Sequence, residues 1–379
     1  MKKIAVLGCG VVGKYMAIDL CQNSKYKVTA VDVNREVLEQ LARDFPIQIR
    51  VEDLSTEEGV LRAVKDADIV IGSVPYSIGY KMLERVIRAG KNIVDISYFP
   101  EDPFGLDDMA KEKGVTAVVD CGVAPGMANI ILGDHMRNMK VTRYECYVGG
   151  VPKSKKAPLG YKSPFPVLEV LEEYAESGRM VEDGKVVVKP MLAETMTIEL
   201  DKVGTLACLN SDGLRTLIRT TEIPDMFEKT LRYPGHVNAM RILRDAGSLN
   251  MTPIQVEGVS VRPIDVTASL LTPIWKYEPG EADLTVMRLV ISGMDEGIPV
   301  TYTYDMVDEY DPETMTLSMT RTTGYTCIAV TRLVLDGGYS QKGIVPPEFV
   351  GRADGCWKSV EKYLEDRGVR CTMQQVRAI

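Results

Sequence analysis

The chain has 379 residues, of which 45% are hydrophobic and 26% charged, a composition typical of globular proteins and a length too great for one ordinary core. Its net charge of −8 gives no sign of the excess of basic residues that nucleic-acid-binding proteins carry, which argues against nucleic acid as a partner. No apolar run reaches the length of a membrane span, and Met1-Lys2-Lys3 leads into a predicted strand and not into a signal peptide. We therefore expect two or three domains and no membrane association.

The cysteines and histidines indicate the compartment and argue against a metal centre. Eight cysteines are scattered through the chain without a C-x-x-C pair, and there are only two histidines, His135 and His236. This pattern suits reduced thiols better than a disulfide framework or a zinc site. We expect a cytoplasmic protein with no bound metal.

A glycine-rich turn follows the first predicted strand. Residues 4–13 read I-A-V-L-G-C-G-V-V-G, where β-forming residues end in G-x-G-x-x-G and pass into a helical pattern over 14–23. We expect Gly8 to form a tight turn, Gly10 to let the backbone approach a pyrophosphate, and Gly13 to let helix and strand pack closely. Val11 and Val12 belong to the turn that leads into that helix, whose free N–H groups face phosphates. The alternative is a glycine turn in an unrelated α/β protein.

The second predicted strand, residues 27–32, ends in an acid. Asp32 stands at about the spacing at which an Asp or Glu binds the ribose hydroxyls of NAD. Its carboxylate would repel a 2′-phosphate, so the sequence favours NAD over NADP. Val33 belongs to the same predicted cofactor edge.

Strands and helices continue to alternate up to residue 120. Further strands are expected at 47–51, 68–75, 92–97 and 115–120, with helices at 34–45, 56–65, 80–89 and 106–113. This alternation predicts an α/β fold with a doubly wound parallel sheet. Ligands of such sheets bind beyond the carboxyl ends of the strands. The predicted cofactor residues there are Gly8, Gly10, Val11, Val12, Gly13, Asp32, Val33, Asp53, Ser73, Val74 and Pro75.

The pattern changes after Asn129. A strand is expected at 143–151, a loop at 152–166, alternating strands over 186–210 and 283–307, and helices at 212–220 and 237–246. We therefore predict a Rossmann domain over 1–124 and an α+β substrate domain over 125–321. Helices expected from residue 324 and over 356–367 would pack back against the first domain.

Three residues are candidates for the catalytic chemistry. Asp120 ends the last predicted strand. Partial desolvation there would raise its pKa and suit it to act as a general base. The alternative is that it caps the helix that follows. Tyr76 can contact the substrate or the nicotinamide, or simply pack in a loop. Lys162 lies in a long loop of the kind that carries function, although a surface lysine is the alternative.

Four residues are candidates for holding a substrate. Asp95 can bind an ammonium, or it can be a solvated loop acid. Arg215 and Arg232 can each make bidentate bonds to a carboxylate, or form structural salt bridges. His236 lies at a Pro-Gly turn that begins a helix. It can contact the substrate, or it can be an ordered residue that caps the helix.

Several motifs resemble the saccharopine dehydrogenase/reductase-like family. They are the glycine turn, V-D-I-S at 94–97, D-C-G-V-A-P-G at 120–126, Y-V-G-G-V-P at 147–152, P-L-G-Y-K at 158–162, S-D-G-L-R at 211–215 and L-R-Y-P-G-H at 231–236. The resemblance covers nearly the whole chain, and within the family it is greatest to the lysine 6-dehydrogenase branch.

The resemblance implies a Rossmann domain followed by a domain that forms a wall of the active site and a homodimer contact. It implies NAD-dependent oxidative deamination of the lysine ε-amine to 2-aminoadipate 6-semialdehyde, which cyclises to a piperideine carboxylate. The alternatives are a saccharopine or carboxynorspermidine dehydrogenase/reductase, and a non-catalytic protein that senses NAD.

Overall fold

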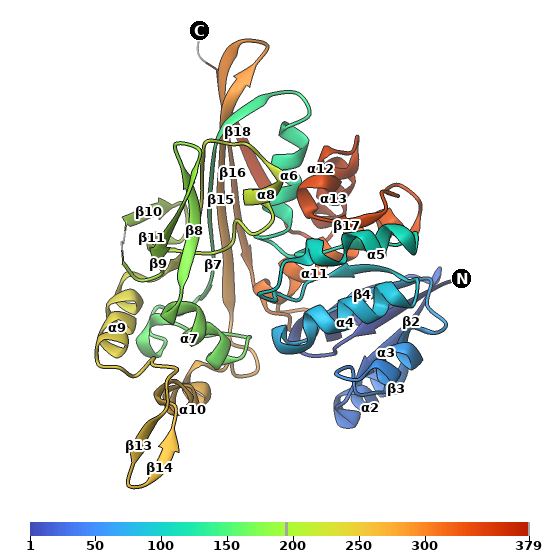
Figure 1. Cartoon of the computed structure of the whole chain (residues 1–379), viewed down its shortest axis with the longest axis horizontal. Helices are drawn as coiled ribbons and strands as arrows, with labels where there is room; N and C mark the ends of the chain where they lie inside the picture. Colours follow the sequence, from blue (N-terminus) through green and yellow to red (C-terminus); the bar gives the residue numbers. More distant parts are fainter. Residues whose placement is uncertain (194–195, 378–379) are drawn as a thin grey trace. The chain divides into compact units, whose positions relative to one another are not determined.

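The chain divides into two compact units. The computed structural model describes residues 1–193 and 196–377. The first unit comprises Met1–Asn138 and Thr320–Val369, and the second comprises Met139–Met319 and the chain from Arg370. Each unit carries its own sheet (Figure 1). Each also has its own hydrophobic core.

The first unit is built on a parallel sheet. Its described strands are β1 (Lys2–Leu7), β2 (Tyr26–Asp32), β3 (Gln48–Val51), β4 (Ile69–Gly72), β5 (Asn92–Asp95), β6 (Thr116–Val118) and β17 (Gly343–Val345). Their order is β17-β6-β5-β4-β1-β2-β3, and every neighbouring pair is parallel. The order reverses between β1 and β4, as in a doubly wound sheet. The predicted α/β fold class is confirmed.

Helices connect these strands. They are α1 (Val11–Cys21), α2 (Arg35–Asp44), α3 (Glu57–Val64), α4 (Tyr76–Arg88), η1 (Pro103–Leu106), α5 (Asp107–Glu112), α6 (Met127–His135), α11 (Ser318–Leu335), α12 (Pro347–Arg352) and α13 (Cys356–Glu365). Asn34 and Thr56 cap α2 and α3, as their residue types favour, by accepting backbone N–H groups. Ile69, Val70 and Ile71 of β4 are fully buried, which explains its uninterrupted apolar run.

The division between the units differs from the sequence-based one at residue 124. α6 belongs to the first unit because it packs closely on α12: a Cβ on Gly133 would lie 2.2 Å from the Glu348 carbonyl oxygen, and one on Gly351 would lie 2.0 Å from that of Ile130. Asn129 also donates to the Glu348 carboxylate at 3.1 Å. α12 follows α6 by more than 200 residues, so no local sequence pattern predicts this contact.

The second unit contains a mixed sheet. Its described strands are β7 (Lys140–Pro152), β8 (Ser177–Glu182), β9 (Lys185–Pro190), β10 (Met196–Leu200), β11 (Gly204–Asn210), β12 (Asp225–Arg232), β15 (Asp283–Asp295), β16 (Ile298–Glu309) and β18 (Cys371–Arg377). The main order is β10-β11-β12-β7-β15-β16-β18. β12 runs parallel to β7, whereas the long β7, β15 and β16 strands pair in antiparallel fashion.

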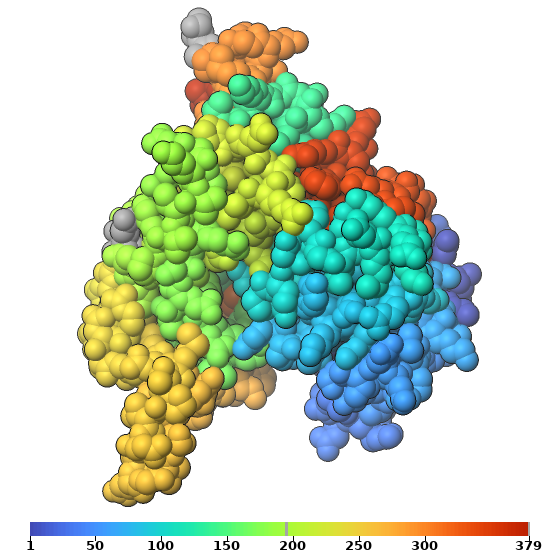
Figure 2. Space-filling model, viewed as in Figure 1, coloured from blue at the N-terminus to red at the C-terminus, as the bar shows by residue number. Residues whose placement is uncertain are grey.

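Short helices and a small hairpin complete the second unit. They are η2 (Pro158–Gly160), α7 (Val167–Ala175), α8 (Leu217–Thr220), α9 (Pro234–Asp245), β13 (Ile254–Val256), β14 (Val259–Val261) and α10 (Pro263–Trp275). The helix expected over 212–220 is wrong in its first half, because Arg215 adopts φ 47° and only the last four residues are helical. The β13–β14 hairpin, in the yellow part of Figure 2, is almost wholly exposed.

Among the described residues, no helix is both long enough and apolar enough to cross a membrane.

Candidate functional site

The glycine turn between β1 and α1 is packed on one side and open at its middle. A Cβ on Gly8 would lie 2.2 Å from the Ser73 carbonyl oxygen, and one on Gly13 would lie 1.9 Å from that of Gly8. A Cβ on Gly10 would meet nothing within 4 Å. Gly8 and Gly13 therefore satisfy packing, while Gly10 faces open space at the N-terminus of α1. Open space beside free helix N–H groups fits the approach of a pyrophosphate.

Asp32 is held at the end of β2 by two backbone donors. The Cys9 N–H donates to Oδ2 at 2.7 Å and the Asn34 N–H donates to Oδ1 at 2.8 Å. The half-buried carboxylate therefore has a fixed orientation beside the glycine turn, as a ribose ligand needs. Val33, the next residue, is 70% exposed, and its side chain is open to solvent at this edge.

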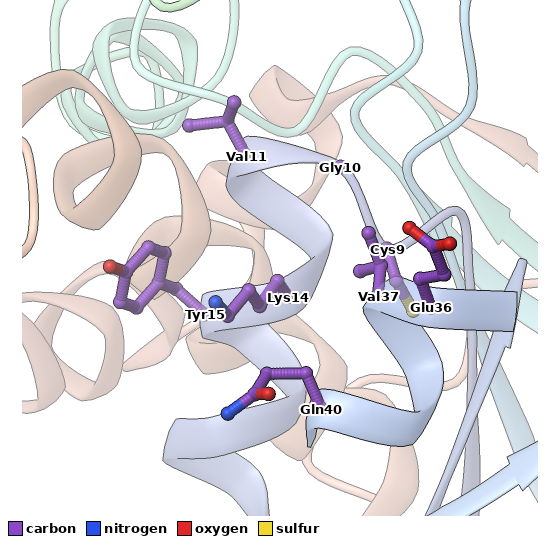
Figure 3. A pocket seen from close by; sticks show the side chains of 8 residues that line it. All are labelled: Cys9, Gly10, Val11, Lys14, Tyr15, Glu36, Val37 and Gln40. Atoms are coloured by element: carbon purple, nitrogen blue, oxygen red, sulfur yellow. The ribbon is translucent and has the colours of Figure 1, made fainter. Parts of the chain in front are cut away.

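A pocket of about 550 Å³ adjoins the glycine turn. Lys14 and Tyr15 of α1 line one side, and Glu36, Val37 and Gln40 of α2 line the other (Figure 3). The lining also includes Cys9, Gly10 and Val11. Val12 is buried and packs inward, so its contribution to a cofactor site would be its backbone.

The turn after β4 is tied to the turn after β5. The Val74 N–H donates to the Ser97 hydroxyl oxygen at 3.3 Å, and the Ser97 N–H donates to Asp95 Oδ1 at 2.7 Å. Pro75 precedes α4, and Tyr76 is the first residue of that helix, not part of a loop. Ser97, which the sequence analysis did not single out, therefore orients the predicted Ser73–Pro75 cofactor turn.

Asp95 is fully buried beneath these turns. Its exposed fraction is 0%, and its Oδ2 atom has no hydrogen-bond partner among the described residues. Burial raises the pKa of this carboxyl to about 7, with a smaller contribution from the charge of Asp120. Such burial does not favour the predicted direct contact with the ammonium group of a substrate.

Asp120 occupies the corresponding position after β6, next to β5 in the sheet. It is 3% exposed and adopts φ 53°, a left-handed conformation that is costly for a residue other than glycine. Strain of this kind persists where the surroundings impose it, often at functional sites. The two carboxyls, Asp95 and Asp120, thus meet at the carboxyl edge of adjacent strands.

Asp53 lies at the same edge beyond β3 but has a local role. Its Oδ1 accepts the backbone N–H of Ser55 at 2.9 Å and the Ser55 hydroxyl at 2.6 Å. These bonds lower the pKa of this exposed carboxyl and form the turn before α3. Asp53 is therefore a turn residue that borders the predicted cofactor edge.

In the second unit, Arg232 is a buried cation among aromatic side chains. It is 6% exposed, and its guanidinium carbon lies 4.5 Å from the ring centre of Tyr161. Nε donates to the Tyr174 hydroxyl at 2.9 Å, Nη2 to the Tyr161 hydroxyl at 3.3 Å, and Nη1 to the Leu231 carbonyl at 2.9 Å. Within the described ranges no carboxylate forms an ion pair with it, although the carboxyl of Glu173 is near enough for the two charges to act on each other.

His236 packs in the same place, and we name Tyr161, Tyr174, Arg232, His236 and Trp275 the Arg232 cluster. Its imidazole is 0% exposed, with Nε2 2.9 Å from the Tyr174 hydroxyl and Nδ1 3.0 Å from the Leu159 carbonyl. Burial, helped by the Arg232 charge, lowers the pKa of His236 to about 3. The imidazole is therefore neutral at physiological pH.

Lys162 and Arg215 lie outside this cluster. The Lys162 ammonium donates to the Lys276 carbonyl at 3.2 Å and forms an ion pair with Glu281. This pairing favours an anchoring role over the predicted catalytic one. Arg215 is half-buried in the turn that precedes α8.

The described residues contain no group of three or more His, Cys, Asp or Glu side chains arranged to hold a metal ion.

Comparison with known families covers almost the whole chain. Residues 4–118 match the family described as "Saccharopine dehydrogenase NADP binding domain", and residues 122–369 match "Saccharopine dehydrogenase C-terminal domain". The chain belongs to the saccharopine dehydrogenase family. The resemblance noted in the sequence motifs is thereby confirmed.

Individual members of the saccharopine dehydrogenase family are distant in sequence. The chain is 28% identical over 266 residues to a saccharopine dehydrogenase [NADP(+), L-glutamate-forming] of Pyricularia oryzae, covering 66% of this chain and 58% of that protein. It is 22% identical to the enzyme of the same name from Schizosaccharomyces pombe, covering 92% and 94%. The solved structure of apo saccharopine dehydrogenase (L-Glu forming) from Saccharomyces cerevisiae superposes with a TM-score of 0.82 at 21% identity, covering 99% of this chain and 100% of that one, which shows the shared fold.

Two features of this family member escaped the sequence analysis. Tyr174 and Trp275 lie on helices α7 and α10, which were not predicted. The spacing Val167, Val170, Leu171, Tyr174 has the period of a buried helix face and could have placed Tyr174 in a core. Nothing in the sequence could pair it with Arg232, which follows 58 positions later.

Proposed function

We propose that the chain is a dehydrogenase that uses NAD to oxidise the ε-amine of L-lysine. The observation that carries this proposal is Arg232, a buried guanidinium that forms no ion pair in the described part of the chain, although the charge of Glu173 acts on it. A buried charge is costly unless it is paired, and the carboxylate of an amino acid would pair it. In a member of the saccharopine dehydrogenase family, this feature supports an amino acid substrate.

Asp32 supports NAD as the cofactor. The relatives named above carry NADP(+) in their names. In this chain the residue at the end of β2 is a carboxylate whose two oxygens are already fixed by backbone N–H groups. A 2′-phosphate placed there would meet like charge, whereas ribose hydroxyls would donate to it.

The proposed overall reaction converts lysine, NAD⁺ and water into 2-aminoadipate 6-semialdehyde, NADH, ammonium and a proton. Bound NAD⁺ would supply the hydride acceptor, and Val74 and Pro75 would border its nicotinamide. Arg232 would hold the substrate carboxylate. Asp120 would accept a proton from the water that adds to the oxidised carbon. Holding both ends of the substrate would select its length.

The test is the appearance of NADH absorbance with NAD⁺ and, separately, L-lysine, ornithine, saccharopine and carboxynorspermidine. Activity on L-lysine with release of ammonia is the expected result. Activity confined to saccharopine or carboxynorspermidine would overturn the proposal. Cofactor binding with no turnover of any compound would favour an NAD-sensing protein.

The second candidate is a saccharopine dehydrogenase/reductase. It is favoured by the names of the relatives and by the superposition with the yeast structure over the whole of both chains. Such an enzyme binds a substrate with more than one carboxylate, so it would need further cations beside Arg232. Lys162 is already paired with Glu281, which is why we place this candidate second.

We also propose a homodimer, as the family resemblance implies. Light scattering should give twice the mass of one chain, and a monomer would contradict this assembly.

A further inference from the structure

Tyr174 lies between Arg232 and His236 and joins them. It is 2% exposed, on the buried face of α7, and its hydroxyl contacts Arg232 Nε and His236 Nε2, each at 2.9 Å. A hydroxyl can donate one hydrogen bond and accept others. The direction of each bond therefore decides how these three side chains depend on one another.

The bond directions follow from the carbonyl at one end. The Leu159 carbonyl can only accept, so His236 Nδ1 carries the proton and donates to it at 3.0 Å. The neutral ring then has Nε2 free to accept, so the Tyr174 hydroxyl donates to it. The hydroxyl oxygen is left to accept from Arg232 Nε. One continuous chain of bonds thus runs from Arg232 through Tyr174 and His236 to the backbone.

The backbone at the end of this chain is held in an unusual conformation. Leu159 adopts φ 56°, followed by Gly160 at φ 65°, and this turn directs the Leu159 carbonyl to His236. The next residue, Tyr161, lies with its ring 4.9 Å from that of His236 and 4.5 Å from the Arg232 guanidinium. His236 therefore anchors both the loop and Tyr161, which flanks the guanidinium.

These contacts leave part of the guanidinium unused. An arginine has five N–H donors, and within the described chain Arg232 uses one on Nε, one on Nη1 and one on Nη2. One N–H on each terminal nitrogen remains. A carboxylate accepts two such parallel N–H groups, provided that the plane of the guanidinium is fixed.

We propose that Tyr174 and His236 are positioning residues, which fix the plane of the Arg232 guanidinium so that its two remaining N–H groups receive the carboxylate of the substrate. The inference deepens the proposed function and rests on it for the identity of that substrate. Neither residue is expected to touch the reacting atoms.

The test is Tyr174→Phe, which removes the hydroxyl and keeps the ring. Binding is measured by calorimetry on the NADH-loaded protein, with L-lysine and with 1,5-diaminopentane, which has the same two amines and no carboxylate. We expect L-lysine to bind about tenfold more weakly, the range for losing a hydrogen bond to a charged group, and 1,5-diaminopentane to change less than twofold. His236→Gln should weaken L-lysine in the same selective way.

Tyr233→Phe is the matched control. It also removes one buried tyrosine hydroxyl bond, to the Pro152 carbonyl at 2.9 Å, but does not touch Arg232. Its affinity for both compounds should match that of the wild type. Melting temperature and NADH affinity identify any variant that has lost its fold. If Tyr174→Phe does not fold, the binding data of His236→Gln decide whether the positioning role holds.

Two results would overturn the positioning role: unchanged L-lysine affinity in folded Tyr174→Phe, or an equal loss for both compounds. If the wild type binds saccharopine and not L-lysine, the proposed substrate fails, and saccharopine takes its place as the probe. Weaker saccharopine binding in Tyr174→Phe would then support the positioning role, and unchanged binding would end it.

Discussion

At the scale of single residues, Asp32 is the side chain to which we assign the choice between NAD and NADP. Its two oxygens accept backbone N–H groups from Cys9 and Asn34, so its orientation does not depend on a ligand. Asp32→Ala should weaken NAD by about tenfold or more, because charge-assisted bonds to the ribose would be lost, and should weaken NADP less. Fluorescence titration with both cofactors measures the ratio, and an unchanged preference would remove Asp32 from the ribose site.

Asp120 is the residue to which we assign proton transfer. It combines near-complete burial with a left-handed backbone at the end of β6. Asp120→Asn keeps the shape and removes the base, so turnover should fall by about 100-fold or more while NAD affinity stays nearly constant. Steady-state rates and cofactor titration check both parts. Wild-type turnover in the variant would refute the assignment.

Asp95 should make stability depend on pH. The folded chain raises its pKa to about 7 from an ordinary value of 3.8, chiefly by burial. Between these values the folded state retains a proton that the unfolded state has lost, so the free energy of unfolding falls as pH rises and levels off above pH 7. The stability of Asp95→Asn relative to the wild type should therefore increase by about 3 kcal/mol between pH 5 and pH 8.

Denaturant unfolding at several pH values measures this difference. A constant difference between Asp95→Asn and the wild type across the range would show that the carboxyl is not perturbed by burial. The Asn side chain can still accept from the Ser97 N–H, so the turn bond is kept.

At the scale of elements, the glycine turn combines packing and binding at different positions. Gly13→Ala should destabilise the first unit, because the new Cβ would lie 1.9 Å from the Gly8 carbonyl oxygen. Gly10→Ala has open space and φ −67°, so the chain should fold normally, yet lose NAD affinity because the methyl group occupies the approach to the helix. Melting temperature and cofactor titration separate the two effects. Normal NAD affinity in Gly10→Ala would place the pyrophosphate elsewhere.

Elements formed by local pattern were predictable, and those formed by long-range pairing were not. β4 has an apolar run, and α2 and α3 carry capping residues at their starts, so each could be located from its own sequence. β17 has only three residues, and pairs with β6 after more than 200 intervening positions. A segment that short has no periodicity, and only its partner strand makes it a strand.

At the scale of the whole molecule, the two units have separate hydrophobic cores. A ligand that binds only the folded state stabilises it by mass action, by about 2.7 kcal/mol at 100 times its dissociation constant. NAD at that concentration should therefore raise the unfolding temperature of the first unit, and Asp32→Ala, with about tenfold weaker binding, should reduce the stabilisation at the same NAD concentration to about 1.4 kcal/mol. Calorimetry measures both, and an equal rise in the variant would contradict the role of Asp32.

The candidate site was predictable to different degrees in the two units. In the first, Gly8 follows a predicted strand and Asp32, Asp95 and Asp120 lie toward the ends of others, and parallel strands bring their carboxyl ends to one edge. In the second, Arg232 and His236 could be named as residue types that bind carboxylates or cap helices, but not as neighbours of Tyr174. The same limit applies to Lys162, whose partner Glu281 lies 119 positions away.

The sequence by itself determined the glycine turn, the acid at the end of β2, the alternation that makes a doubly wound sheet, and the family motifs, because each is encoded within a few neighbouring residues. Only the tertiary structure decided that Asp95 is buried with one oxygen unpartnered, that Lys162 is paired, and that Arg232 has aromatic neighbours and no ion pair in the described chain. Burial and pairing depend on groups that are far apart in the chain, and it is burial and pairing that set the charge each side chain can offer to a ligand.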